Sequence, residues 1–324
     1  MRSLGKGEKS EKIPSGLGAL FHKELTDHLE SKRFTLVFLL MFLAAVMSLA
    51  GAISTIQGES LTSSDYIFLR FFTTSSESIY SFATFMAFLG PLMGIALGFD
   101  AINNERSLGT LNRLASQPIH RDAIITAKFL AGSAAIAIVV AFLGLAVSGM
   151  GILVTGISPS LEETLRLAVF LVVLWAYISF WLALASLFSV VCRHAATAAL
   201  SAIAIWLFLT LFMSLVASGL ANLLFPTDGM EGMLNLMSNY SFELGLNRIS
   251  PYYLFSEAAV TILNPSVRSI GIVTTSQLYG AVDSYLPLGQ SLLLIWPHLV
   301  VITALVIVLF AVAYIAFMRQ EIRA

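Results

Sequence analysis

The chain has 324 residues, of which 57% are hydrophobic and only 11% are charged, and its mean hydropathy is +0.86. A soluble domain usually carries about 25% charged residues, so this composition excludes an ordinary water-soluble protein and indicates that lipid is the main solvent. The net charge of -1 argues against nucleic acid as a partner, because there is no excess of basic groups to neutralise phosphates.

Six long apolar blocks predict six membrane-spanning helices, because a spanning helix needs about 20 mostly apolar residues. In hydrocarbon the backbone must satisfy its own hydrogen bonds, and unalternating blocks of this length do so as helices. The sequence therefore predicts an all-α integral membrane protein. The predicted spans run from Phe34 to Ile56, Ile79 to Phe99, Phe129 to Thr155, Leu167 to Val191, Ala195 to Leu224 and Ser291 to Phe317.

The basic residues predict the orientation, since Lys and Arg gather on the cytoplasmic side of a membrane protein. If the N-terminus is inside, all Lys and Arg residues lie inside except Arg70, Arg166, Arg248 and Arg268. The sequence therefore predicts that both ends of the chain are cytoplasmic.

Two pieces precede the first span. Residues 1–16 are charged and contain Gly, Ser and Pro, which predicts a flexible cytoplasmic tail. Residues 17–33 predict an amphipathic helix lying in the membrane interface, and a generic juxtamembrane helix is the plain alternative. Its apolar face holds Leu17, Leu20, Phe21, Leu25, His28 and Leu29, and its polar face holds Lys23, Glu24, Asp27 and Glu30.

Three glycines recur at every fourth position of the second span, at Gly90, Gly94 and Gly98. This spacing places them on one helix face and permits another helix to come close. Packing against a neighbouring span is the first interpretation, and a moving gate is the alternative.

The loop between spans two and three, residues 100–128, predicts a short helix that ends before Pro118. Leu108, Leu111 and Leu114 lie on one face of it. A half-apolar helix of this size has no core of its own, so we expect it to need a partner surface, and its charges suit a protein groove better than lipid headgroups.

The stretch between spans five and six, residues 225–290, is too long for an unstructured loop, and we expect helices in it. Met230, Met233 and Met237 begin a helical stripe. Residues 251–265 form an apolar segment between prolines that is too short to span and predicts an interfacial or re-entrant helix.

No metal or cofactor site is expected in this chain. A more specific hypothesis is that the three methionines bind copper(I), but methionine commonly fills packing faces. The single cysteine, Cys192, excludes a disulfide framework and a thiolate cluster. His298, at membrane depth, is interpreted as a packing residue, with a functional role as the alternative.

Three motifs resemble the permease subunits of type-2 ABC exporters. One lies in the loop after span two and the others flank the first and last spans, so the resemblance covers nearly the whole chain. The first motif is Glu105, Arg106, Gly109, Thr110, Leu111, Leu114, Ser116, Pro118 and Arg121, followed by Lys128; the others are His22, Lys23, Glu24, Leu25 with Ser31, Lys32, Arg33, Phe34, and Phe317, Arg319, Glu321, Ile322.

The resemblance implies a role for each cytoplasmic piece. The helix 17–33 would be an elbow helix that includes Glu24, Leu25 and Arg33, and residues 34–324 would be the six-span domain. The loop helix would be a coupling helix that docks into a separate ATP-binding subunit. Its docking surface would be Glu105, Arg106, Gly109, Thr110, Leu111, Leu114 and Arg121.

The same resemblance implies a complex in the plasma membrane of a prokaryote. A second permease copy, identical or paralogous, would complete the pathway, and ATP and Mg would bind the partner subunit. In agreement, the sequence has no G-x-x-x-x-G-K-[ST] phosphate loop and no catalytic motif, so we expect a transporter subunit and not an enzyme. The alternatives are an ATP-independent transporter, a channel or a structural membrane protein, and the sequence names no cargo.

Overall fold

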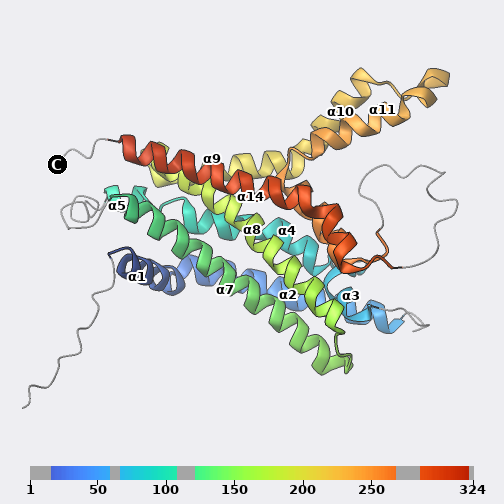
Figure 1. Ribbon diagram of the computed structural model, residues 1–324, viewed down its shortest axis with the longest axis horizontal. Coiled ribbons are helices and arrows are strands. Elements are labelled where there is room, and N and C mark those ends of the chain that lie inside the picture. The colour runs from blue at the N-terminus through green and yellow to red at the C-terminus, as the bar shows by residue number, and fades with distance from the viewer. Residues whose placement is uncertain (1–15, 59–65, 108–120, 268–284, 321–324) are drawn as a thin grey trace, which may run out of the picture.

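A computed structural model describes residues 16–58, 66–107, 121–267 and 285–320. Within these ranges every regular element is a helix, and six helical segments are long and apolar enough to cross a membrane. The predicted all-α fold with six spans is therefore confirmed. The spans lie roughly along the long axis of the molecule (Figure 1).

The spans are α2, α4 with α5, α7, α8, α9 with η1 and α10, and α14, and four further helices among the described residues connect or precede them. Their bounds are α1 Gly16–Glu30, α2 Lys32–Gly58, α3 Ile67–Thr73, α4 Phe82–Gly98, α5 Asn103–Ser107, α7 Arg121–Thr155, α8 Leu161–Val191, α9 Ala195–Leu207, η1 Phe208–Phe212, α10 Met213–Leu224, α11 Gly229–Asn247, α12 Pro251–Leu263 and α14 Leu288–Arg319. We call the two ends of the bundle the α1 end and the α3 end (Figure 1).

Two spans begin six or more residues earlier than the apolar blocks predict. The helix α7 starts at Arg121 and not at Phe129, and α8 starts at Leu161 and not at Leu167. At the start of α8 the Ser160 side chain accepts from the Glu163 backbone N–H and the Glu163 carboxylate accepts from the Ser160 N–H, a capping box that starts a helix in polar sequence. Hydropathy marks the part of a helix that lies in lipid, and capping residues mark where the helix begins.

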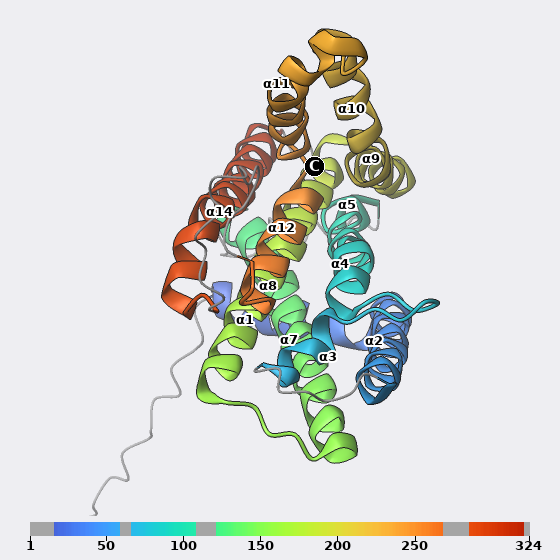
Figure 2. The ribbon, with the colours of Figure 1, turned by 90° about the vertical axis from the view of Figure 1, so that its right-hand side faces the viewer.

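The helix α8 is the centre of the bundle and lies between α4 and α14 (Figure 2). The helix α4 comes close to α8, because the three glycines of α4 face it. A Cβ placed at Gly94 would lie 2.5 Å from the Ile178 carbonyl oxygen, and one at Gly98 would lie 2.7 Å from the Leu182 carbonyl oxygen. The glycines thus bring the two backbones together.

The contact between α4 and α8 also supplies a hydrogen-bond donor that α4 lacks. Pro91 lies inside this helix and has no N–H for the Ala87 carbonyl, four residues earlier. The Tyr177 hydroxyl of α8 donates to that carbonyl at 2.8 Å. A neighbouring span therefore satisfies the group that the proline leaves open, as the membrane interior requires.

At the α3 end a fully buried arginine, Arg166 of α8, ties three elements together. Its guanidinium donates to Glu162 at 2.9 Å, to the Ile262 carbonyl at the end of α12 at 2.9 Å, and to Ser291 of α14 at 3.2 Å. It also donates to the Leu286 carbonyl at 2.5 Å. The start of α14 and the end of α12 are thereby fixed to α8.

The fifth span is interrupted by the π-helical turn η1 and continues as α10. The helices α10 and α11 run side by side and project from the rest of the bundle (Figures 1 and 2). Ser250, between α11 and α12, donates to the Leu209 carbonyl within η1 at 2.7 Å. The predicted helices between spans five and six are present as α11 and α12, while residues 268–284 of that stretch lie outside the described residues.

Candidate functional site

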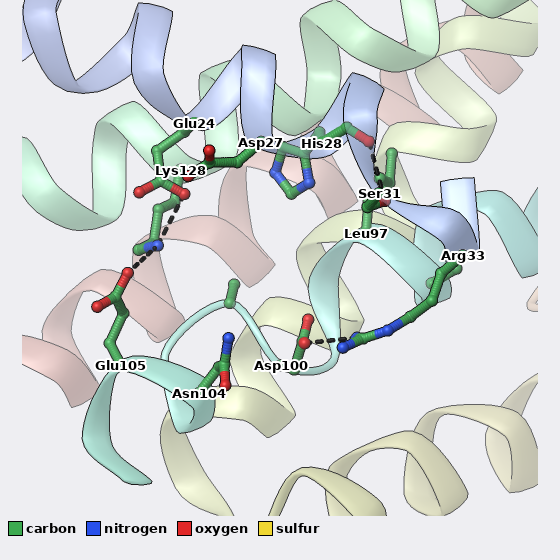
Figure 3. Close-up of a pocket in the computed structure, with 12 residues that line it drawn as sticks. Glu24, Asp27, His28, Ser31, Arg33, Leu97, Asp100, Asn104, Glu105 and Lys128 are labelled. Carbon is green, nitrogen blue, oxygen red and sulfur yellow. Dashed lines mark hydrogen bonds and ion pairs between the residues drawn. The ribbon is translucent and has the colours of Figure 1, made fainter. Parts of the chain in front are cut away.

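The candidate site is a cluster of charged side chains at the α1 end, where α1, α5 and the start of α7 meet (Figure 3). It contains three of the residues that the sequence singles out, Glu24, Arg33 and Glu105. All three precede residues 108–120, which lie outside the described residues, and Lys128 of α7 follows them.

Lys128 of α7 is the centre of this cluster. Its ammonium group donates to Glu24 of α1 at 2.8 Å and to Glu105 of α5 at 3.1 Å. Both Lys128 and Glu24 are buried. A charge removed from water needs such partners, so one lysine joins α1, α5 and α7 into a single unit.

A second ion pair joins the first span to the end of α4. Ser31 lies at the interruption between the helices α1 and α2. Its hydroxyl donates to the His28 carbonyl and accepts from the Phe34 N–H. This bend directs the Arg33 side chain, in the first turn of α2, toward Asp100. Arg33 Nη1 donates to Asp100 Oδ2 at 2.5 Å. The guanidinium also lies over the Phe99 ring, 5.1 Å from its centroid, a favourable cation–π arrangement.

The two ion pairs line a pocket of about 180 Å³ that also contains His28, Asp27 and Asn104. Burial lowers the pKa of His28 below its ordinary value, because the charged imidazolium is poorly solvated there. Most of the side chains that line the pocket are polar or charged.

Both flanks of residues 108–120 are tied to the bundle by further hydrogen bonds. Ser189 of α8 accepts from the N–H groups of Ile102 and Asn103 at 2.9 and 3.2 Å, which caps the start of α5. Gln320, after α14, accepts from Arg106 through its side chain at 2.5 Å and from Arg121 through its carbonyl at 2.9 Å.

The structure describes part of the predicted docking surface. Gly109, Thr110, Leu111 and Leu114 lie outside the described residues. Arg106 and Arg121 both reach Gln320, and Glu105 faces Lys128. The docking role of all these residues stays a prediction.

The elbow residues lie in two helices and not in one. Glu24 and Leu25 belong to α1, while Arg33 belongs to α2 because the chain bends at Ser31. The placement of Glu24 on the outward polar face of the amphipathic helix is wrong, since its side chain is buried against Lys128. Leu25 packs against the apolar core of the bundle.

Lys128, Asp100 and Gln320 are the site residues that the sequence reasoning does not assign to the cluster. The spacing around Lys128 is a signal in the sequence, because Lys128 follows Ile124 by four residues and Ile125 by three, which places it on the apolar face of α7. A lysine on a buried face requires an acidic partner. Asp100 and Gln320 are recognised only through partners distant in the sequence.

In the described part of the chain no group of three His, Cys, Asp or Glu side chains is placed to hold a metal ion. The side chains of Met230 and Met233 are outside the description, and Met237 is exposed. His298 is buried and contacts Glu257.

Comparison with known proteins gives two matches. The model of a family described as ABC-2 family transporter protein matches residues 18–322. The chain is also similar to a protein of Stutzerimonas stutzeri named probable ABC transporter permease protein NosY, with 31% identity over 137 residues. That match covers 42% of this chain and 45% of the relative, so it spans less than half the length of either protein.

Proposed function

The chain belongs to the ABC-2 family of transporter proteins, a family of ABC transporter membrane subunits, and we propose that it couples to a separate ATP-binding subunit to drive export. In this proposal residues 108–120 and their flanks form the contact through which that subunit acts. ATP and Mg bind the partner, and the chain itself catalyses no reaction.

The observation that carries the proposal is the anchoring of both flanks of residues 108–120. Lys128 connects α5 to α1 and α7, and Gln320 receives hydrogen bonds from Arg106 and Arg121. A force applied to this loop therefore reaches α1, α7 and α14 through buried or short polar contacts. Such contacts transmit displacement when the elements move as rigid units.

The remaining parts of the proposal follow from the charge distribution and the family. The α1 end is cytoplasmic, with both chain termini inside, because the Lys and Arg residues gather there. The protein lies in the plasma membrane of a prokaryote and works with a second permease copy, identical or paralogous.

The test is co-purification with a candidate ATP-binding subunit of the same organism, followed by a measurement of Mg-dependent ATP hydrolysis in nanodiscs. Leu111→Asp should abolish co-purification, because a carboxylate would replace an apolar docking side chain. Leu161→Asp is the matched control, since Leu161 is 78% exposed and lies at the opposite end of the bundle.

We expect the wild-type pair and the Leu161→Asp pair to co-purify with equal yield and equal ATPase activity. Retention of the ATP-binding protein by the Leu111→Asp variant would refute the assignment of the docking surface. Failure of the wild-type chain to bind the ATP-binding protein would refute the proposed coupling and favour an ATP-independent transporter or channel.

A further inference from the structure

A second polar cluster lies inside the bundle, far from the cytoplasmic one, where α11, α12 and α14 meet. Its centre is Glu257 of α12, which accepts from Arg248 Nε at 3.0 Å and Nη2 at 2.8 Å. The carboxylate also lies 2.7 Å from His298 Nε2 of α14. Because an ionised carboxylate only accepts hydrogen bonds, Nε2 carries the proton of this contact.

The cluster lies between spanning helices, about a third of the way along α14 from the α3 end. Ser250, two residues after Arg248, bonds to the Leu209 carbonyl, and Leu209 lies near the middle of the fifth span, Ala195–Leu224. His298 lies about 15 Å along α14 from its first residue, Leu288, at 1.5 Å per residue. Charged groups at this depth are costly unless all their polar atoms find partners.

Three polar groups of the cluster lack side-chain partners among the described residues. Arg248 Nη1 donates no hydrogen bond, and the buried His298 Nδ1 has no partner. Pro297 lies inside α14 and has no N–H for the Leu293 carbonyl. In α4 a tyrosine hydroxyl fills the corresponding gap, whereas in α14 no described side chain donates to Leu293.

The three residues that carry these groups, Arg248, His298 and Leu293, all line one pocket of about 370 Å³. Arg248 and His298 lie among apolar walls made by Leu254, Leu293, Pro297 and Val301. Leu293 is 72% exposed and Val301 is 42% exposed, so the pocket is bordered by side chains on the outer surface of α14. A molecule in the membrane can therefore enter it sideways.

We propose that this pocket binds the head of a phospholipid that carries a hydrogen-bond donor beyond its phosphate. The phosphate accepts from Arg248 Nη1, the headgroup ammonium or hydroxyl donates to His298 Nδ1 and the Leu293 carbonyl, and the start of the acyl chains lies on Leu293 and Val301. Ethanolamine and glycerol headgroups both have this chemistry. Choline has the phosphate but no N–H or O–H donor.

The test is native mass spectrometry of the purified full-length chain titrated with phosphatidylethanolamine, phosphatidylglycerol or phosphatidylcholine of identical acyl chains. The wild type should bind the first two about fivefold more tightly than phosphatidylcholine, the value of one to two net hydrogen bonds. The measurement needs no ATP-binding partner, so its result is independent of the proposed coupling.

Two neighbouring valines provide a matched pair of variants. Val301→Trp fills the pocket mouth and should reduce binding of phosphatidylethanolamine to the level of phosphatidylcholine. Val300→Trp is the control, because Val300 is 52% exposed but does not line the pocket, and it should keep the fivefold preference. His298→Leu should remove the preference while phosphatidylcholine binding stays unchanged.

Equal binding of the three lipids by the wild type would overturn the proposal. A headgroup preference that survives in both Val301→Trp and His298→Leu would overturn it as well, because the preference would then arise elsewhere on the protein.

Discussion

At the α1 end, Lys128 is the side chain that joins three helices, α1, α5 and α7. It is a cation on the buried face of an otherwise apolar helix, and its two acidic partners belong to different elements. Removing the ammonium leaves the buried Glu24 carboxylate without its buried counter-charge, with the exposed Lys23 ammonium still in contact, and breaking a buried pair costs more than the pair contributes.

The first prediction concerns this lysine. Lys128→Met should lower the free energy of unfolding by about 3 kcal/mol, measured as a lower midpoint of thermal unfolding in detergent. Lys23→Gln serves as the control, because Lys23 also contacts Glu24 but its side chain is 53% exposed; it should change the midpoint little. Equal losses in the two variants would show that burial of Lys128 is not the cause.

The second prediction concerns pH. Burial lowers the pKa of His28, and so does Lys128, while Glu24, Asp100 and Asp27 act in the opposite direction. The folded chain therefore binds this proton more weakly than the unfolded chain, and stability falls as pH drops below the ordinary histidine pKa of about 6.5.

The thermal midpoint of the wild type should accordingly decline between pH 7 and pH 5.5. In the variant His28→Gln, which keeps a polar side chain without a titrating group, the decline should be smaller. An unchanged pH profile in that variant would exclude His28 as a source of the effect.

Among the helices, the contact of α4 with α8 depends most strictly on residue size. Gly94 faces the backbone of α8, and an added Cβ would meet the Ile178 carbonyl oxygen at 2.5 Å and the Leu182 nitrogen at 2.8 Å. Backbone atoms cannot rotate away as a side-chain tip can. The two helices would have to separate, and their shared contacts, including the bond from Tyr177 to Ala87, would be strained.

The third prediction concerns this contact between α4 and α8. Gly94→Ala should lower the free energy of unfolding by about 2 kcal/mol, as overpacking of a tight contact does. Gly149→Ala in α7 is the matched control, because nothing lies within 4 Å of its added Cβ, and alanine there should be neutral or slightly stabilising. A stable Gly94→Ala protein would mean that the helices can move apart at little cost.

For the whole molecule, hydropathy predicts the number and order of the spans, because lipid imposes length and apolarity on each of them. It misses features that depend on distant partners. The start of α5 is capped by Ser189, nearly ninety residues away in sequence, and Glu24 is buried because Lys128 lies opposite. The π-helical turn at 208–212 has no distinctive composition, and its Leu209 carbonyl accepts from Ser250, 41 residues further along the chain.

The fourth prediction tests the proposed orientation. Cys192, the single cysteine, follows α8 at the α1 end. In intact cells a membrane-impermeant maleimide should leave it unlabelled, and permeabilised cells should show labelling. Ser158→Cys in a Cys192→Ser background places the thiol in the exposed turn between α7 and α8 and should be labelled in intact cells. The reverse pattern would invert the topology.

The buried guanidinium of Arg166 has a consequence for biogenesis. Its partner Ser291 lies 125 residues further along the chain and the Ile262 carbonyl 96 residues further. While a ribosome is still making the second half of the protein, α8 already sits in the bilayer with an arginine whose later partners do not yet exist. Assembly of the α3 end must therefore wait for the last span, and a chain truncated before α12 would present to the quality-control proteases of the membrane a guanidinium that keeps Glu162 but lacks its partners in α12 and α14.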